Sequence, residues 1–493
     1  MKLSTSHLLS VASLPVFAFA HADNHHHHRQ ILAASSSSSK SGALSPSSAP
    51  SSSTTLSSFP PSFSLHSQNP TAVPLSSIVV NAPSAPTSIM PTPATAGTKP
   101  SGIPNAPGLP DLSTLLPGNY PALDKPPPTD SPQVQQWIQE VQQSGVEIPS
   151  FSPNVAGGCP ANPAAVADSS RCWWTCGGCS RSSDITTCPQ KFTWGLTYDD
   201  GPAPYTPDLL NYLDQVNLKS TFFVVGSRAI SFPGLLQQEY LKGHQIAVHT
   251  WSHPSLTTLS NEEIIAELGW SKKIIKDVLG VVPTMMRPPF GDIDDRVRAI
   301  CKAMNLIPVL WTRISPTATF DTDDFNIHGG VTSVQQVLYN WENILGNVST
   351  INTGFIVLEH DLFQQSVEVA TGYILPDALA HQPQFNIQPV VNCLNLQAGD
   401  AYVETNDNST NPLPLSCTYT YSFLLFVFRF HNLTSQPLQP LQPILPIQHM
   451  SLAVAAQERP RIVPFLGLLR TRVSLPSSPP CSAFWRSLSR RCP

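Results

Sequence analysis

The chain has 493 residues and a net charge of −5 at pH 7; it contains 51 prolines, while charged residues make up only 12% of it. This length allows one large domain or two ordinary ones. The weakly negative charge, with no basic stripe across the central region, argues against a nucleic-acid partner. Because the proline and serine excess lies before residue 130, the folded part is smaller than the length suggests.

The first twenty residues have the pattern of a secretory signal peptide. Lys2 gives a positive start, residues 8–20 are apolar, and residues 18–20 form an A-x-A cleavage pattern. The alternative is a membrane anchor, but the apolar run is shorter than the roughly 20 residues that a span needs. We therefore expect residues 1–20 to be removed and the protein to be secreted. Three glycosylation sequons agree with export, at Asn347, Asn408 and Asn432.

Residues 21–130 are rich in Ser, Thr and Pro and include an unbroken serine run at 35–39. Such a composition buries too little apolar surface to offset the entropy of ordering, which favours an O-glycosylated stalk. The four histidines at 25–28 could bind a metal loosely, although a solvated N-terminus of the mature chain is the simpler interpretation. At the other end, residues 401–493 are predicted to be a disordered tail, because the stretch after 418 has no clear periodicity and many prolines.

A lead-in segment, residues 131–190, contains five of the ten cysteines. In an oxidising compartment such a cluster indicates a disulfide framework. Cys176 and Cys179 form a C-x-x-C pair, but a zinc knuckle or a redox pair fits poorly, since no second pair follows. Trp173 and Trp174 could form a carbohydrate-stacking platform; packing beneath the disulfides is the interpretation we favour.

The lead-in segment also carries a helical pattern, because Val134, Ile138 and Val141 share one face with Trp137 beside it. Beyond it, short apolar runs alternate with further helical patterns over residues 191–400. The runs predicted as buried strands are 193–198, 220–225, 245–248, 307–311 and 354–358. The predicted helices are 260–279, 292–305 and 333–345.

The first of these helices has the clearest signals, with Ser260 and Glu263 as a capping box and Gly280 as its stop. Strand–helix alternation over about 200 residues argues for a parallel sheet, open or closed into a barrel. Functional groups are then expected at the carboxyl ends of the strands.

Candidate metal ligands lie just after two of these strands. Asp199 and Asp200 precede Gly201-Pro202, so one carboxylate could bind a cation while the other takes a proton, although such a sequence could also be only a turn. His249 and His253 follow another strand, and Pro254 disfavours a helix there, so we place them in an irregular turn. One carboxylate and two imidazoles are the open set that a hydrolytic zinc centre needs.

Three further segments could serve such a site. Residues 287–291, Arg-Pro-Pro-Phe-Gly, combine a rigid backbone with an arginine able to bind a carboxylate, although a solvated loop is the plain alternative. Residues 321–325 are acidic and could form a solvated or a calcium-binding loop. His360 ends an apolar strand and is a candidate acid catalyst, although a lone histidine there is more often structural.

These five segments resemble the five motifs of the carbohydrate esterase family four polysaccharide deacetylases, and they occur in the same order along the chain. The match is closest to secreted fungal chitin deacetylases. The similarity covers roughly residues 155–400, and Tyr198 and Phe325 replace the usual Phe and Trp. The segments and the motifs that they resemble are TYDDGP at 197–202 for T-F-D-D-G-P, HTWSH at 249–253 for H-[ST]-x-x-H, RPPFG at 287–291 for R-x-P-[YF]-G, DTDDF at 321–325 for D-x-x-D-W, and LEH at 358–360 for L-x-H.

This resemblance implies a distorted (β/α) barrel with fewer than eight regular units. It also implies a metal, usually Zn²⁺ with Co²⁺ or Mn²⁺ as alternatives, bound by Asp200, His249 and His253. The implied catalytic groups are Asp199 as general base, His360 as general acid, Arg287 holding Asp199, Asp324 orienting His360, and the backbone N–H of Tyr205 at the oxyanion. The implied substrate-binding residues are Leu358, Phe325, Pro289 and Phe290.

The resemblance further suggests a disulfide between Cys188 and Cys393, whereas the partners of the other clustered cysteines stay open. It implies hydrolysis of the N-acetyl group of N-acetylglucosamine units in chitin, giving chitosan and acetate. The alternatives are a deacetylase of another acetylated glycan and a chitin-binding wall protein without turnover. We expect a monomer in the extracellular space or cell wall, with attachment to wall or membrane left open.

Overall fold

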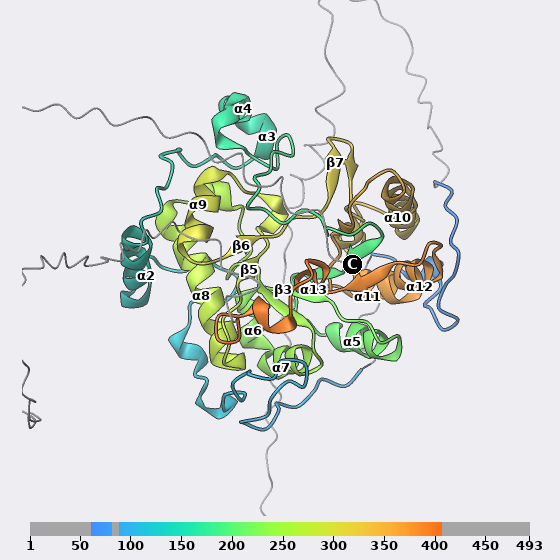
Figure 1. The fold of residues 1–493 in the computed structure, drawn as a ribbon, viewed down its shortest axis with the longest axis horizontal. Coiled ribbons are helices and arrows are strands. Elements are labelled where there is room, and N and C mark those ends of the chain that lie inside the picture. Colours follow the sequence, from blue (N-terminus) through green and yellow to red (C-terminus); the bar gives the residue numbers. More distant parts are fainter. Residues whose placement is uncertain (1–60, 81–87, 407–493) are drawn as a thin grey trace, which may run out of the picture. The chain divides into compact units, whose positions relative to one another are not determined.

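The computed structural model describes residues 61–80 and 88–406 (Figure 1). The chain divides into two units, residues 1–420 and 421–493, and all described residues belong to the first. The predicted signal peptide, the histidines at 25–28 and nearly all of the predicted tail therefore lie outside the described residues.

Two parallel sheets form the centre of the fold. One has the order β2–β3–β4–β5–β6 and the other the order β10–β1–β9. Their strands are β1 (Thr193–Gly195), β2 (Thr197–Asp199), β3 (Thr221–Val224), β4 (Gln245–Val248), β5 (Met285–Met286), β6 (Ile307–Pro308), β9 (Phe355–Ile356) and β10 (Asn386–Gln388). Single parallel bridges join Asp199 to His360 and Asp321 to Leu358, which links the sheets around the strand ends. The predicted class, a distorted (β/α) barrel, is confirmed.

The strand predicted over 193–198 is two strands that belong to different sheets. β1 pairs with β9 and β10, whereas β2 pairs with β3. Leu196 lies at the crossing: its N–H donates to the carbonyl of Gln388, and its carbonyl accepts from the N–H of Thr221. A continuous apolar run indicates a buried strand, but it does not show with which other strands that strand pairs.

Helices surround these sheets, and the three that were predicted in this region are present. They are α8 (Asn261–Leu279), α9 (Asp295–Ala303) and α10 (Val334–Val348). The capping box of α8 forms between Ser260 and Glu263, and Gly280 ends the helix with a φ of 80°. Shorter helices were not predicted: α5 (Thr206–Gln215), α6 (Gly226–Ser231), α7 (Pro233–Leu241), α11 (Gln364–Val369), α12 (Leu375–Ala380) and α13 (Val390–Cys393).

The lead-in segment begins with α2 (Pro132–Gln143), which packs on α8. Its buried residues are Val134, Ile138 and Val141, the three that the helical pattern predicted. Trp137 lies directly over Gly269 of α8, where an added Cβ would come within 2.3 Å of the indole ring. The absence of a side chain at Gly269 therefore permits this close packing.

Three disulfides lie within the described residues, and they decide between the alternatives for the clustered cysteines. Cys188 pairs with Cys393, as the resemblance implied. Cys159 pairs with Cys176 and Cys172 with Cys179, so the two cysteines of the C-x-x-C pair belong to different disulfides. They form neither a redox pair nor half of a zinc knuckle.

The proline-rich region differs from the expectation of a stalk. Residues 61–80 and 88–130, here called the wrapping segment, lie against the folded unit, and Ile78, Ile103 and Leu109 are buried in its core. The segment bonds successively to α12, α11, α7 and α6, through the pairs His66–Asp377, Val79–Gln365, Ala94–Gln237 and Asp124–Ser227. Proline already restricts φ, so ordering this chain costs less entropy, and a few spaced aliphatic anchors are enough.

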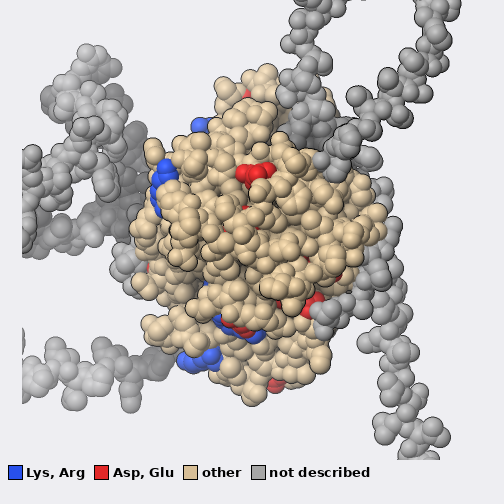
Figure 2. All heavy atoms as spheres, turned by 90° about the vertical axis from the view of Figure 1, so that its right-hand side faces the viewer, with Lys and Arg blue, Asp and Glu red and all other residues tan. Residues whose placement is uncertain are grey.

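The fold also continues past the predicted boundary at residue 400. Ala401 and Tyr402 are buried, and the Tyr402 hydroxyl accepts the N–H of Ile246 in β4 at 2.9 Å. Within the described residues, none of the helices has the length and apolar character to cross a membrane. On the face shown in Figure 2, Lys, Arg, Asp and Glu are sparse, in agreement with the low charged content of the chain.

Candidate metal centre and active site

The paired aspartates lie at the carboxyl end of β2. β2 ends at Asp199, and Asp200 has a φ of 77°, so the chain turns sharply there. Both residues line one cavity of about 300 Å³, as expected for carboxylates at a strand end that turns. The left-handed backbone at Asp200 is unusual for a residue other than glycine, and such strain is often found at functional sites.

The two histidines come from an irregular turn after β4. β4 ends at Val248, and both Thr250 and His253 have left-handed backbone, with φ of 63° and 61°. This geometry agrees with the argument from Pro254 against a helix. The turn brings the Nε2 atoms of His249 and His253 to 3.2 and 3.1 Å from Oδ1 of Asp200.

These three residues have the donor atoms that a cation requires. Nδ1 of His249 lies 2.7 Å from the carbonyl oxygen of Arg287, so Nδ1 carries the proton and Nε2 keeps its lone pair for a ligand. Oδ1 of Asp200 is buried and has no hydrogen-bond partner among the described residues. The three ligand atoms lie within 4.8 Å of one another, which makes the group a candidate metal centre.

The charges at this centre favour the ligand forms of the side chains. Burial alone would raise the pKa of Asp200, but attraction to His253 and the nearby His249 hold it well below its ordinary value. Burial lowers the pKa of His253 against the pull of Asp200. A carboxylate beside neutral imidazoles is the state in which these groups bind a metal.

Asp199 is held separately by Arg287. Nη1 of Arg287 donates to Oδ1 of Asp199 at 2.7 Å, and the two side chains are 0% and 2% exposed. The same nitrogen donates to Oγ1 of Thr197 at 2.9 Å. Arg287 is therefore not a solvated loop residue, and its fixed position leaves Oδ2 of Asp199 3.8 Å from Nε2 of His249.

His360 and Asp324 form a second pair, in which Asp324 is buried and His360 is 12% exposed. Nδ1 of His360 donates to Oδ1 of Asp324 at 2.8 Å, and the His360 N–H donates to Oδ2 at 3.0 Å. Burial alone would lower the pKa of His360, but attraction to Asp324 and the hydrogen bond raise it to about 10. The imidazole is thus protonated at neutral pH and can donate a proton. The acidic segment 321–325 turns Asp324 inward instead of forming only a solvated or calcium-binding loop.

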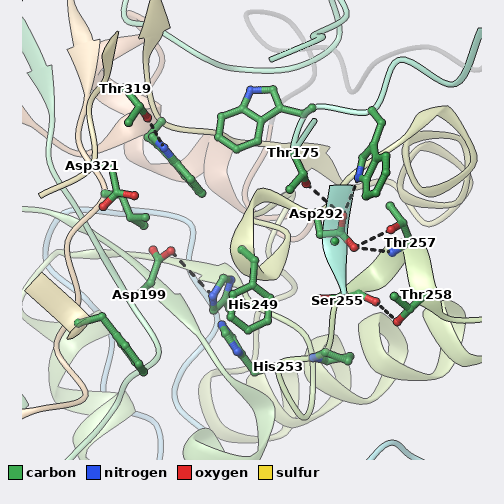
Figure 3. A pocket seen from close by; sticks show the side chains of 18 of the residues that line it. Thr175, Asp199, His249, His253, Ser255, Thr257, Thr258, Asp292, Thr319 and Asp321 are labelled. Atoms are coloured by element: carbon green, nitrogen blue, oxygen red, sulfur yellow. Dashed lines mark hydrogen bonds and ion pairs between the residues drawn. The ribbon is translucent and has the colours of Figure 1, made fainter. Parts of the chain in front are cut away.

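The cavity brings together most of the predicted residues, but not all of them. Asp199, His249 and His253 point into it in Figure 3, and Leu358, Phe325 and Phe290 also line it. Arg287 and Asp324 lie behind the residues that they hold. Tyr205 and Pro289 are not among the lining residues, and Tyr205 immediately precedes α5.

Other residues of the cavity were not predicted. Trp311 lies at the end of the predicted strand 307–311, and Asp292 directly follows the Arg-Pro-Pro-Phe-Gly segment, so their positions were a usable signal. Residues 154–158 carry no such signal, because small residues before a cysteine cluster have no typical role. Trp173 and Trp174 are each 5% exposed, as expected for packing, yet both also line the cavity.

Comparisons with known proteins identify the family of the chain. The family model described as polysaccharide deacetylase matches residues 186–309. Chitin deacetylase 1 of Cryptococcus neoformans var. grubii is 50% identical over 340 residues, which is 68% of this chain and 71% of that protein. The chitin deacetylase of Amylomyces rouxii is 36% identical over 250 residues, covering 45% of this chain and 56% of that protein.

Among solved structures, the chitin deacetylase of Colletotrichum lindemuthianum aligns at 25% identity with a TM-score of 0.39, covering 45% of this chain and 95% of that one. The relatives establish that the chain belongs to the polysaccharide deacetylase family. The resemblance inferred from the five motifs is confirmed.

Proposed function

We propose that the protein removes the N-acetyl group from N-acetylglucosamine units of chitin, releasing acetate and leaving chitosan. The observation that carries the proposal is the presence in one cavity of the Asp200–His249–His253 group, Asp199 and His360. The names of the relatives, chitin deacetylases, support chitin as the substrate.

We infer that the resident metal is Zn²⁺, with Co²⁺ or Mn²⁺ as alternatives. Two imidazole nitrogens and one carboxylate are a typical open zinc set, and Asp200, His249 and His253 would hold the ion. When bound, a zinc ion polarises a carbonyl oxygen and lowers the pKa of water.

Asp199 is the general base in this proposal. Its Oδ1 is bonded to Arg287, so Oδ2 is the oxygen that accepts a proton from the attacking water. Arg287 prevents the carboxylate of Asp199 from rotating away. The oxygen of the water then forms a bond to the acetyl carbon.

His360 is the general acid. Its Nδ1 is engaged by Asp324, so Nε2 donates the proton to the sugar nitrogen as the carbon–nitrogen bond breaks. The products are acetate and the free amine. Asp324 stabilises the imidazolium before transfer and fixes the plane of the ring.

Further groups complete the site in the proposal. Tyr205 precedes α5, whose first N–H groups have no acceptors within the helix, and its N–H would stabilise the oxyanion. Leu358 and Phe325 would enclose the acetyl methyl group, and Phe290, placed by Pro289, would cover the side next to His253. The rings of Phe290 and His253 lie 4.6 Å apart.

We infer a secreted monomer that acts in the extracellular space or at the cell wall. Three disulfides are consistent with an oxidising compartment. Residues 1–20 would direct export, while the serine-rich residues before 61 could serve as a spacer to a wall or membrane attachment.

The test is acetate release from N-acetylglucosamine oligomers, with and without a chelator, by wild type, Asp199→Asn and His360→Ala. Each substitution is expected to lower the rate by about 10²- to 10⁴-fold, because it removes a proton-transfer group. Asp130→Asn, at an exposed site, is the control and should match wild type. No acetate from any chitin oligomer with metal bound would contradict the chitin assignment, and chelator-insensitive release would contradict the metal requirement. Oligomer binding without release would favour the non-catalytic alternative.

A further inference from the structure

The side of the cavity that faces the catalytic residues is built by a separate part of the chain. Residues 154–179, here called the wall segment, contribute Val155, Gly157, Trp173 and Thr175 to its lining. This segment precedes residues 186–309, which the family model matches. Figure 3 shows Thr175 and Asp292 across the cavity from Asp199.

The wall segment is held rigidly. Its two disulfides, Cys159–Cys176 and Cys172–Cys179, close short loops. Arg298 of α9 donates to the carbonyl oxygens of Cys172 at 2.6 Å and Cys179 at 3.1 Å. A surface fixed in this way can contact a ligand without a large cost in conformational entropy.

Asp292 joins the wall segment to the turn that carries the metal ligands. Its Oδ1 accepts from Nε1 of Trp173 at 2.7 Å and from Oγ1 of Thr175 at 3.1 Å. Its Oδ2 accepts from the N–H of Thr257 at 3.0 Å and from its hydroxyl at 2.7 Å. Because Thr257 lies four residues after His253, one buried carboxylate sets the wall at a fixed distance from the metal centre.

A second set of contacts fixes the wall on the other side. The Trp174 ring packs directly over Gly291, where an added Cβ would come within 2.2 Å of it. Arg313, at the start of β7 (Arg313–Ser315), lies over the same ring at 5.4 Å and donates to the Trp174 carbonyl at 3.2 Å. Gly291 belongs to the segment 287–291 that also carries Arg287, so the wall packs directly against the residues that form the site.

The surface that the wall presents to the cavity is mainly apolar and uncharged. Val155 is 61% exposed, and the same cavity is lined by Gly157 and Gly158 and by Trp173 and Trp174, which are each 5% exposed. The acidic side chains of the cavity lie mostly on the catalytic side, including Asp199, Asp200 and Asp321. Apolar and aromatic surfaces suit the C–H faces of a neutral sugar ring, and no charged side chain of the wall segment lines the cavity to pair with an anionic one.

We propose that the wall segment is a substrate-binding surface that holds a neutral N-acetylglucosamine unit next to the unit whose acetyl group faces the metal centre. The inference rests on the proposed function, since it assigns the neighbouring position of the same glycan. The preference of the enzyme for longer oligomers and for uncharged sugar units would then depend on residues outside the five motifs.

The experiment measures binding of the N-acetylglucosamine tetramer by calorimetry to full-length, chelator-treated protein, so that no turnover is needed. Val155→Asp places a carboxylate on the wall, and the dissociation constant should rise about tenfold, because the sugar must bury that charge. Val166→Asp is the matched control, since Val166 lies in the same segment, is 42% exposed and does not line the cavity. It should bind within about twofold of wild type.

Equal binding by Val155→Asp and wild type would overturn the proposal, as would an equal loss in both variants. Tetramer binding that depends on Val155, without acetate release by the metal-loaded wild type, would support the wall and contradict the proposed function. An oligomer that carries a carboxylate on alternate units should bind more weakly than the neutral tetramer, and equal affinity would contradict the preference for a neutral sugar.

Discussion

The catalytic centre and the wrapping segment are stabilised in opposite ways. In the centre, charged groups are mostly buried and are held by partners of opposite charge, as Arg287 holds Asp199. The wrapping segment lies along the outside of the helices and is anchored by isolated aliphatic residues such as Ile103 and Leu109. Loss of one group in the centre should therefore change activity, while loss of an anchor should lower stability and leave the chemistry unchanged.

The largest effect is expected for His253→Ala. The substitution removes one of three metal ligands, so metal content and acetate release should fall together, the latter by about 10²-fold or more. His253 is partly exposed and packs on Phe290, so the unfolding midpoint of the metal-free protein should change little. His381→Ala, which removes a ring stacked on Phe385, is the control and should keep its metal. Full metal content in His253→Ala would show that the ligand set is wrong.

Leu109→Ala makes the complementary change in the wrapping segment. Leu109 is 2% exposed, and truncating such a residue costs about 2–5 kcal/mol of unfolding free energy. The matched control is Leu116→Ala in the same segment, because Leu116 is 59% exposed and should contribute less than about 0.5 kcal/mol. Denaturant unfolding measures both, and kcat/KM per folded molecule should stay at the wild-type value. Equal stability of the two variants would mean that the segment is not packed as described.

A smaller effect is expected for Asp324→Asn, and it should be visible mainly as a change in pH dependence. The pKa of His360 is raised to about 10 by Asp324, so the acid stays protonated below that pH and activity is lost as the pH rises through it. A cation at Asp200 opposes protonation of His360. The alkaline limb of the pH–rate profile of the metal-loaded enzyme therefore lies below pH 10. The asparagine removes the attraction, and the limb should move at least one pH unit lower. An unchanged limb would exclude His360 as the titrating acid.

The catalytic centre could be predicted because its chemistry depends on short segments. Asp199, His249 and His360 each follow a strand, and parallel strands gather their carboxyl ends at one edge. The neighbours in space were harder to predict: the run at 193–198 gave no sign that Leu196 marks a change of sheet. Asp292 was overlooked because its four hydrogen bonds come from segments distant in the chain.

The wrapping segment was misinterpreted for a different physical reason. Its overall composition is that of a disordered chain, and averages over 110 residues hide a few anchors such as Ile78 and Leu109. Their burial depends on grooves between helices that are far away in the sequence. Composition therefore indicates how much conformational entropy is lost when such a segment becomes ordered. It does not show which surface of the folded unit buries the anchors and offsets that loss.

The smallest effects concern two buried tyrosines, one in the first motif of the catalytic centre and one that contacts the wrapping segment. Tyr198 replaces the usual Phe of the first motif, is 0% exposed, and its hydroxyl has no hydrogen-bond partner among the described residues. Tyr198→Phe should therefore leave the unfolding free energy unchanged or raise it by up to about 1 kcal/mol, because it removes an unpaired buried polar group. The hydroxyl of Tyr373 instead donates to the carbonyl of Val73 in the wrapping segment at 2.7 Å.

Tyr373→Phe should accordingly lower the unfolding free energy by about 0.5–1.5 kcal/mol, as expected for loss of one hydrogen bond. Both variants should release acetate within about twofold of wild type, since neither hydroxyl lines the cavity. A tenfold loss of activity in Tyr198→Phe with the fold intact would assign a catalytic role to that hydroxyl. If Tyr373→Phe were as stable as wild type, the polar contacts of the wrapping segment would contribute nothing, and its attachment would depend on the aliphatic anchors alone.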